Sequence, residues 1–569
     1  MQQEPEAKRS SIFVLVSKIE PSSQPVLFFP YPASVQLERS CPAGYEVREI
    51  SGNESELRVS FAATKRFLYN AITNSLRATS VRKTAFNNTW NIFWGEHLKT
   101  QEFGALLPFQ RVNHFPGSFE LGRKDRLCAH LLRMRKKHPT AYADIIPETY
   151  LTANDYDKQQ FLSRFHAEVN VVWILKPPNL SCGRGIKLVS ASTHAAPKLS
   201  KKKAYVVQVC LPIFLFRFSG NHHFLTLSYS LPHGLKLVKR YVANPFLING
   251  LKFDLRVYVA VTSYDPLRIH LFHDGLVRFC TEKYSTSKSE LQNPFGHLTN
   301  YSINKKNAAA FQKNQDDIEA HAFSSSKWSL QMLFKYLCDE GKTRELESFQ
   351  EELEDLIVKT LIAVEDKLAS ASSGSSCRRN GFELYGFDVL LEGESMKPRL
   401  LEVNVFPSLS SSSPMDKRIK TVLVSDLFQL VGIPFVDAQR EAQQLDKAKQ
   451  DRLHGIKQPR QLGAGVTPTI LQKEKDAQRR RRTFEGLLQG SASSLMLSQI
   501  EGEDLQLIKE MEEELHRCGH FKRIFPTPQS FDTYANLFDT LRYRNLLCMR
   551  WLQHTNQDGG RRLPRTGKK

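Results

Sequence analysis

The sequence predicts an α+β fold. Between residues 169 and 279, short runs rich in β-branched and aromatic residues follow one another, among them VNVVWILKP and FDLRVYVAVTSY. Helical segments such as SKWSLQMLFKYLCDE and LESFQEELEDLIVKTLIAVEDKLA come next, and two more strand-like runs, ELYGFDVLLEG and PRLLEVNVF, follow them. Interleaved strands and helices of this kind are typical of α+β architectures.

Changes in composition divide the 569 residues into segments of different character. We expect a flexible leader (1–56), an N-terminal subdomain of helix-like segments (57–165), a β-rich central subdomain (166–262), a mixed C-terminal subdomain (263–435), a basic arm (436–499) and a small helical module with a tail (500–569). The leader is polar and contains several prolines. Residues 436–482 hold 12 lysines and arginines against 6 acidic residues, so the arm is predicted to be helical or disordered.

The net charge of +20 and the pI of 9.4 favour an acidic partner, which by composition alone is nucleic acid, an anionic membrane or an acidic protein. Nine scattered cysteines without a CxxC pair argue against a disulfide framework or a zinc site, and for a reducing compartment. The N-terminus lacks the pattern of a signal peptide, and no apolar stretch reaches the roughly 20 residues of a membrane span. We therefore expect a cytosolic protein.

The first candidate site is the segment ILKPPNLSCGRGIKLV. Its first strand ends at Lys176, and a loop with Gly183 and Gly185 leads into the next strand. Such a loop can fold its backbone amides over phosphate groups while the lysine supplies a positive charge. Glycine pairs are common, so on this motif alone a surface hairpin with one exposed lysine is the simpler interpretation.

The second candidate site is the strand-like segment GLKFDLRVYV. Alternate residues of a strand share a face, so Lys252, Asp254 and Arg256 point to one side, and Phe253 and Leu255 point to a core on the other. An exposed charged face is one interpretation. The order cation, anion, cation beside such an apolar reverse side favours a site, in which the anion keeps the two cations oriented.

The third candidate site combines GFDVLLEG with RLLEVNVFPS. Asp388 lies in the first strand, and Glu402 and Asn404 alternate in the second. Three hard oxygen ligands from adjacent strands suit Mg²⁺, and the alternative is a hairpin whose polar residues face water. Because an unpaired buried carboxylate is costly, the apolar surroundings of Glu402 favour the metal. A fourth polar run, GHLTNYSINKKN, would by itself be a simple turn.

Together these segments resemble the tubulin–tyrosine ligase-like enzymes, and within them the polyglutamylase branch. The resemblance is carried by KFDLR, TSYDPLRIHLFHDGLVRF, HLTNYSINKKN, ELYGFDVLL and LEVNVFPSLSSSSPMDKRIK, with VNHFPGSFELGRKDRL upstream and HRCGHFKRIFP downstream. It covers roughly residues 57–435 and, more loosely, 500–555. So many matches in the same order make chance an implausible explanation. The resemblance implies an ATP-grasp fold with N-terminal, central and C-terminal subdomains.

The resemblance also implies roles for individual residues. The catalytic set is Lys252, Asp254, Arg256 and Arg278, and the Mg²⁺ ligands are Asp388, Glu402 and Asn404. L-Glutamate is bound by Arg278, Tyr301, Ser302 and Lys420. ATP is bound by Lys176, Cys182, Gly183, Arg184, Gly185, Gln208, Arg240, Tyr241, Val242, Lys252, Phe253, Asp254, Thr299 and Asn300. Among these, Gln208 and residues 240–242 form the adenine hinge, and Cys182 departs from relatives that commonly have arginine or another polar residue there.

The activity implied by the resemblance is ATP-dependent polyglutamylation. An acceptor carboxylate takes the γ-phosphoryl group of ATP, and the amine of free L-glutamate attacks the acylphosphate. Arg278 would read the donor by binding its carboxylate bidentately, which favours glutamate over glycine or tyrosine. Acidic acceptors, which are tubulin tails and also histone chaperones, explain the positive net charge. The alternatives are a glycine ligase of the same family, and a non-catalytic basic protein that binds microtubules or nucleic acid.

The expected partners are therefore tubulin or microtubules and L-glutamate, without a membrane or nucleic acid. We expect a monomer in the cytoplasm and at the cytoskeleton, with the cilium or basal body as a further location. The basic arm is either a contact with microtubules or a solvated tail.

Residues 209–239 have no counterpart in the relatives, in which AYVVQ continues directly into RYVANPFLINGLKFD. The segment interrupts the adenine hinge between Gln208 and Arg240, and it is apolar without a helical or strand period. We interpret it as a translated intron or an error in the gene structure, with a genuine lineage-specific insertion as the alternative. We expect the segment to lie outside the sheet.

Overall fold

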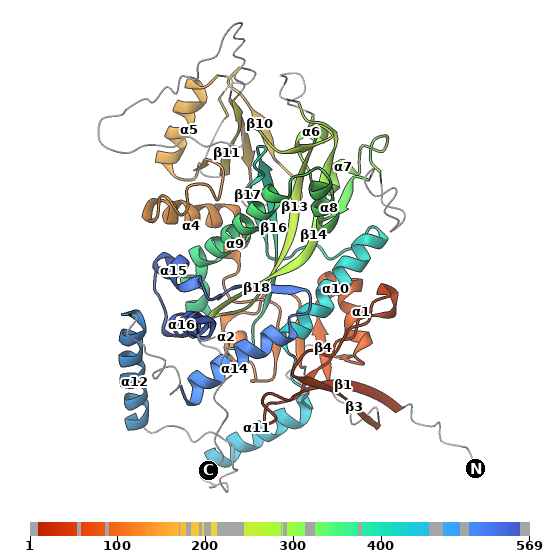
Figure 1. Cartoon of the computed structure of the whole chain (residues 1–569), viewed down its shortest axis with the longest axis vertical. Helices are drawn as coiled ribbons and strands as arrows, with labels where there is room; N and C mark the ends of the chain where they lie inside the picture. Colours follow the sequence, from red (N-terminus) through yellow and green to blue (C-terminus); the bar gives the residue numbers. More distant parts are fainter. Residues whose placement is uncertain are drawn as a thin grey trace, which may run out of the picture.

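The computed structural model of the chain describes residues 9–53, 59–85, 90–169, 171–177, 184–192, 196–197, 206–212, 244–285, 287, 293–312, 325–373, 378–454, 470–489 and 500–557. Figure 1 shows a central sheet with a second sheet at the top of the view and the N-terminal strands at the lower right. The mixture of helices and mainly antiparallel strands agrees with the predicted α+β class.

A seven-stranded antiparallel sheet occupies the centre of the molecule. Its main strands are, in spatial order, β15 (Lys327–Ser329), β14 (Leu267–Lys283), β13 (Leu251–Tyr264), β16 (Glu383–Glu392) and β17 (Lys397–Asn404). Two more strands pair with this set, β12 (Leu247–Ile248) with β13 and β18 (Phe521–Phe525) with β14. The turn from β12 to β13 consists of Asn249 and Gly250, whose φ values of 52° and 75° are those of a tight type I′ hairpin.

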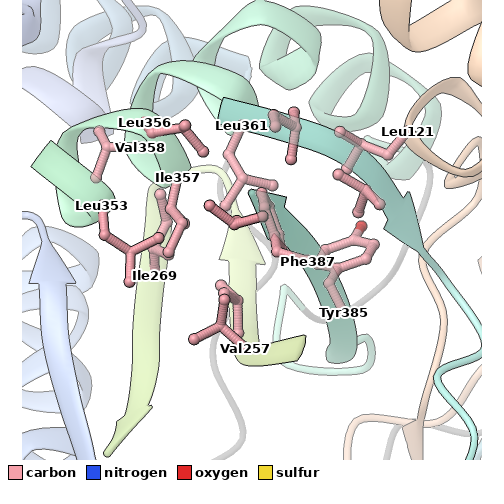
Figure 2. Close-up of a cluster of buried hydrophobic side chains, with 14 of the residues drawn as sticks. Leu121, Val257, Ile269, Leu353, Leu356, Ile357, Val358, Leu361, Tyr385 and Phe387 are labelled. Carbon is pink, nitrogen blue, oxygen red and sulfur yellow. The ribbon is translucent and has the colours of Figure 1, made fainter. Parts of the chain in front are cut away.

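Helices cover both faces of the central sheet. On one face, α9 (Thr343–Ser372) packs against the strands, and Figure 2 shows Leu353 of this helix beside Ile269 and Leu361 beside Phe387. The shorter helix α8 (Leu330–Asp339) belongs to the same apolar cluster. On the other face, α10 (Pro414–Val431) packs against Tyr258 and neighbouring residues. From Phe253 to Val261, the alternation of β13 therefore points odd-numbered residues toward α9 and even-numbered residues toward the α10 side.

A second antiparallel sheet, partly covered by α5 (Asp155–Ala167), consists of β10 (Lys187–Val189), β9 (Val171–Lys176), β11 (Val206–Pro212) and β8 (Thr149–Leu151). Strand β11 includes the first four residues of the segment 209–239, and Val209 and Pro212 pair with Trp173 and Val171. Our expectation that the whole segment lies outside the sheet is therefore wrong for these four residues. Their run VCLP continues VVQ, so the strand extends along β9 past Gln208, with a register shift between Val209 and Leu211. Residues 213–243 lie outside the described residues.

The expectation of a flexible leader is wrong for residues 9–53. These residues form an antiparallel sheet of β2 (Val26–Leu27), β1 (Arg9–Ser17) and β3 (Tyr45–Asn53). Ile12, Val14 and Leu27 are at most 1% exposed and share an apolar cluster with α10. The alternating run SIFVLVS carries this strand, and the many polar residues and prolines around it obscured the pattern.

Short elements complete the remaining N-terminal region and the polar run after β14. A parallel sheet contains β5 (Arg82–Lys83), β4 (Ser60–Ala63), β6 (Ile92–Trp94) and β7 (Arg111–Val112). The helices are η1 (Ala33–Val35), η2 (Lys65–Phe67), α1 (Asn70–Ala78), α2 (Thr100–Gly104), α3 (Phe119–Gly122), α4 (Lys124–Lys137), α6 (Pro294–His297) and α7 (Tyr301–Asn304).

The predicted separation of a basic arm from a small helical module is also wrong. The helices are α11 (Ala438–Leu453), α12 (Ile470–Leu488), α14 (Gly502–Arg517), α15 (Ser530–Tyr534), η4 (Ala535–Leu537) and α16 (Tyr543–Gln557). Leu487 of α12 packs in one cluster with Met511 of α14 and Leu546 of α16, so the end of the arm belongs to the module. The module in turn joins the central sheet, because β18 pairs with β14. None of the helices that the structure describes has both the length and the apolar character to cross a membrane.

A buried carboxylate connects three distant parts of the chain. Asp426 of α10 is fully buried and accepts hydrogen bonds from Tyr31 (2.8 Å), Arg39 (2.5 Å) and the backbone and ring nitrogens of His520 (3.1 and 2.8 Å). Burial by itself raises the pKa of Asp426, but the bonds from His520 and the charge of Arg39 outweigh it and lower that pKa. The N-terminal strands and the C-terminal module are therefore both attached to α10.

We predict that Asp426→Ala lowers the free energy of unfolding by about 3–5 kcal/mol, because it leaves the Arg39 guanidinium buried without its partner. Because the pKa of Asp426 is lowered by folding, this contribution is present above the unfolded pKa of about 4 and is lost as the pH falls through the folded value. Urea unfolding between pH 7 and pH 3 measures both effects. Asp446→Ala, on the exposed face of α11, is the control and should change stability by less than about 0.5 kcal/mol.

Candidate active site

Four charged side chains form one network on the α10 side of the central sheet. Asp254 and Arg256 belong to β13, Arg278 to β14 and Asp388 to β16. In the strand register, Asp254 is opposite Arg278 and Arg256 is opposite Asp388. Each arginine donates to both oxygens of its partner, at 2.8 and 2.5 Å for Arg278 and at 2.5 and 3.0 Å for Arg256. Arg278 Nη2 also lies 2.9 Å from Asp388 Oδ2, which joins the two pairs.

The network is almost closed to solvent. Asp254 and Asp388 are 3% exposed and Arg256 is 9% exposed. Burial alone would raise the pKa of Asp388, but the charges of Arg256 and Arg278 outweigh it and hold that pKa well below its usual range. At Asp254, which contacts a single guanidinium, burial is the largest influence and raises the pKa. Two carboxylates and two guanidinium groups thus balance one another in a dry environment.

Strand β13 has the alternation that the sequence predicts. Phe253 and Leu255 are at most 1% exposed and belong to the core on the α9 side, whereas Asp254 and Arg256 belong to the charged network. The prediction that Asp254 orients Lys252 and Arg256 of its own strand is wrong, however. Asp254 pairs instead with Arg278 of the next strand. Lys252 directs its ammonium group toward the ring of Tyr284, at 5.7 Å from the ring centre.

The contacts of Arg278 differ from those expected for bidentate binding of the donor carboxylate. A bidentate grip on a bound amino acid would use two nitrogens along one edge of the guanidinium. In the structure, Nε and Nη2 are bonded to Asp254, and Nη2 also contacts Asp388. Nη1 is the nitrogen that these bonds do not use.

The predicted metal ligands lie side by side. In the register, Asp388 is opposite Glu402 and Gly386 is opposite Asn404, and Asn404 Nδ2 lies 3.4 Å from Asp388 Oδ2. The prediction that these carboxylates are unpaired without a metal is wrong. Asp388 has two arginine partners, and Glu402 Oε2 lies 2.9 Å from Lys124 Nζ. A metal ion at this position would share both carboxylates with cations of the chain.

A second polar cluster lies at the start of α10. Asp416 is fully buried and lies 2.8 Å from Lys327 Nζ and 3.4 Å from Lys420 Nζ. Burial lowers the pKa of Lys420 to about 8, although the charge of Asp416 opposes this shift. Lys327 is opposite Arg278 in the strand register, and its ammonium group lies 4.5 Å from the ring centre of Tyr301. The second cluster therefore adjoins the charged network.

The residues assigned to ATP binding are distributed over both sheets. Lys176 is the last residue of β9, and Gly185, with a φ of 71°, lies in the connection to β10. Gln208 lies in β11, where it pairs with Ile174 of β9. On the other side, the Thr299 hydroxyl forms a hydrogen bond with Asp254.

The structure describes some of the remaining residues assigned to nucleotide or donor binding and not others. Arg184 is exposed in the connection between β9 and β10, Asn300 precedes α7, and Ser302 lies within α7. The structure does not describe Cys182, Gly183, Arg240, Tyr241 and Val242.

Two lysines that were not predicted from the sequence contact predicted site residues. Lys124, at the start of α4, contacts Glu402, and Lys327, in β15, contacts Tyr301. The segment GRKDRL gives no sign that Lys124 differs from a surface lysine. For Lys327 a weak signal exists, because the buried Trp328 beside it implies that Lys327 points away from the core.

One further group in the described part of the chain could by proximity bind a metal, namely His97, His114 and Glu383. Its contacts favour a hydrogen-bond network instead. His114 Nδ1 lies 2.7 Å from Glu383 Oε1, a hydrogen-bond distance that leaves no room for an ion between them. The other carboxylate oxygen accepts bonds from the Phe115 amide (3.0 Å) and the Ser118 hydroxyl. Burial and the neighbouring His114 lower the pKa of His97 to about 4.

Comparison with known proteins identifies relatives that match most of the chain. The tubulin monoglutamylase TTLL4 of Homo sapiens is 33% identical over 492 residues, which cover 85% of this chain and 36% of that protein. The tubulin polyglutamylase TTLL5 of Mus musculus is 34% identical, covering 79% of this chain and 30% of that protein. The tubulin polyglutamylase ttll-4 of Caenorhabditis briggsae is 31% identical, covering 83% and 68%. The chain thus spans about a third of the length of the first two relatives.

A model of the tubulin-tyrosine ligase family matches residues 104–441. This range contains the second sheet, the main strands of the central sheet, α9 and α10, and with them every charged residue of the network. The match covers more than half of the chain, and the charged side chains lie on adjacent strands within it. The chain therefore belongs to the tubulin-tyrosine ligase family.

Proposed function

We propose that the chain is an ATP-dependent protein–glutamate ligase with an ATP-grasp fold, which joins L-glutamate to glutamate side chains in the acidic tails of tubulin. The observation that carries the proposal is the buried network of Asp254, Arg278, Asp388 and Arg256, with the oxygen donors of β17 beside it. Fixed charges of both signs in a dry site suit phosphoryl transfer, which depends on positioning and charge neutralisation. Relatives named as tubulin monoglutamylase and polyglutamylase support the glutamate donor and the tubulin acceptor.

The reaction follows from the chemistry of the carboxylate, which forms an amide at neutral pH only after its oxygen becomes a leaving group. The acceptor carboxylate attacks the γ-phosphorus of ATP and ADP leaves. The α-amine of L-glutamate then attacks the acylphosphate, loses a proton and expels phosphate, which leaves an isopeptide bond. The chain needs no nucleophile of its own. Burial raises the pKa values of Cys128 and Cys280 to about 12, so both remain thiols.

ATP would bind between the second sheet and the central sheet. We assign these sheets to the central and C-terminal ATP-grasp subdomains. Lys176 and the amide of Gly185 would contact the phosphates from one side, and Lys252 would approach from β13 on the other. Thr299, which is bonded to Asp254, connects this surface to the charged network.

The residues of β16 and β17 fit a divalent cation. Asp388, Glu402 and Asn404 offer neighbouring oxygen atoms of the hard type that Mg²⁺ prefers. When bound, Mg²⁺ would neutralise charge on the phosphates of ATP. Arg256 would orient the Asp388 carboxylate, because it is bonded to both oxygens.

The donor site would combine Nη1 of Arg278 with the cluster of Asp416, Lys327 and Lys420 at the start of α10. Lys327 and Lys420 supply two further positive charges around the single carboxylate of Asp416. Tyr301 borders Lys327, and Ser302 follows Tyr301 in α7. Glutamate carries two carboxylates and glycine carries one, so this excess of cations favours glutamate. It is the observation that separates the proposal from the glycine ligase.

A non-catalytic microtubule-binding protein is the other alternative. The complete charged network argues against it, since buried ion pairs are a costly way to stabilise a fold. The positive net charge of +20 would draw the enzyme to acidic tails at microtubules, and acidic histone chaperones would attract it in the same way. We place the protein in the cytoplasm, at the cytoskeleton.

We predict that Glu402→Gln abolishes ligation and leaves the fold intact. The substitution keeps the volume but removes the charge for the metal, and loss of the contact with Lys124 should cost at most about 2 kcal/mol. Transfer of labelled glutamate, glycine or tyrosine to tubulin, with ATP and Mg²⁺, is the assay, and thermal unfolding checks the fold. Near wild-type transfer by the folded variant would disprove the metal assignment, and labelled glycine in place of glutamate would favour the glycine ligase.

We predict that the KM for glutamate rises by about tenfold per pH unit above pH 8, because Lys420 loses its proton near this pH and with it the charge that attracts the donor. Lys420→Arg should remove this dependence, because a guanidinium stays charged. Initial rates at varied glutamate concentration between pH 7 and pH 9.5 measure the effect. A parallel rise in both proteins would exclude Lys420 as its source.

We predict that Arg481→Gln with Arg482→Gln weakens microtubule binding several-fold, most at low salt where charges are least screened. Both arginines are exposed on α12, whereas Phe484 and Leu487 of the same helix make its apolar contacts, so the packing should persist. Co-sedimentation with microtubules is the measurement. Ligation to a short acidic peptide should be unchanged, and an equal loss on the peptide would place α12 in the catalytic site.

A further inference from the structure

The contact between Lys124 and Glu402 has a consequence for how the site takes up its metal. Lys124 is the first residue of α4, and it follows α3, which lies close against β17. Gly122 makes this approach feasible, because a Cβ at that position would lie 2.9 Å from Val405 Cγ2. The close packing brings the Lys124 ammonium group to 2.9 Å from Glu402 Oε2.

The pair is largely shielded from water. The side chains of Lys124 and Glu402 are 15% and 24% exposed. Their charges therefore interact more strongly than those of a surface pair, and the ammonium group neutralises the carboxylate when no metal is bound.

The Lys124 ammonium group already binds one oxygen of the Glu402 carboxylate. It lies at hydrogen-bond distance from Oε2, and Lys124, Glu402 and Lys176 line one cavity together with Cys128. A divalent cation needs oxygen ligands at about 2.0–2.1 Å, so the cation and the ammonium group compete for this oxygen.

We infer that Lys124 is a positioning residue that competes with the divalent cation for the Glu402 carboxylate, and that the phosphates of the nucleotide relieve this competition. The inference rests on the proposed function, in which Glu402 binds the metal and Lys176 the phosphates. Because Lys176 lines the same cavity, phosphates that reach Lys176 also come near Lys124. They offer the ammonium group another anion and free the carboxylate for the metal. The site then takes up metal together with nucleotide and binds metal weakly alone.

Removal of the Lys124 charge should change the two affinities in opposite directions. Lys124→Met should bind Mg²⁺ about tenfold more tightly in the absence of nucleotide, because a competing charge is lost. The same variant should bind ADP more weakly in the absence of Mg²⁺, because a phosphate partner is lost. A lysine that only attaches α4 to β17 would instead lower stability and leave the Mg²⁺ affinity unchanged or weaker.

Isothermal titration calorimetry with MgCl₂ and with ADP, each alone, is the test on the full chain. Lys397→Met is the matched control, because Lys397 forms a similar pair with Asp144 (2.8 Å) away from the cavity, and it should change neither affinity. Lys124→Arg keeps the charge and should retain weak Mg²⁺ binding. In a Glu402→Gln background, Lys124→Met should no longer raise the Mg²⁺ affinity.

The outcomes separate this inference from the proposed function. If the wild-type protein does not bind ADP, the proposed nucleotide site is wrong. If it binds ADP, and Lys124→Met leaves the Mg²⁺ affinity unchanged or lowers it, the competition is wrong. Should Lys124→Met not fold, as judged by circular dichroism, Lys124→Gln takes its place under the same criteria.

Discussion

The buried network of two arginines and two aspartates constrains the rest of the structure. Its members come from β13, β14 and β16, and each charge has its partner on another strand. A shift of one strand by one residue would turn its charges toward the apolar α9 side and leave the partners unpaired. Apolar residues of similar size would often stabilise a core equally well, so the stability of the fold does not by itself explain the network. The pairing of these charges fixes the register of the central sheet and the geometry of the site together.

The two faces of the central sheet serve different purposes because the helices cover them unequally. On the α9 side the contacts are apolar along the strands, with Val257 and Phe387 among them (Figure 2). On the other side, α10 covers the part of β13 with Tyr258 and Ala260, and Asp254 and Arg256 lie further along the same face. The first turns of α10 bring Asp416 and Lys420 beside these charges. The site thus lies where the apolar cover of the α10 side ends.

Segments from both ends of the chain support this arrangement from outside the family match. The N-terminal strands share a cluster with α10, β18 extends the central sheet, and Asp426 binds Arg39 and His520 at once. Because α10 also carries Lys420, displacement of either terminal segment would disturb the proposed donor side of the site. Lys124, the proposed competitor of the metal, likewise depends on close packing, here of α3 against β17. The charges of the site are set in place by tertiary contacts far from it in sequence.

The sequence by itself determined the α+β class, the alternation of β13, the adjacency of Asp388 with Glu402 and Asn404, and the family, because these depend on short-range periodicity and on contiguous motifs. It misjudged residues 9–53, the start of the segment 209–239 and the C-terminal module, whose order depends on distant partners. Only the tertiary structure decided which charge pairs with which. Arg278 binds Asp254 across the sheet, and Lys124 reaches Glu402 although 278 positions separate them, because packing and register select partners that local sequence does not encode.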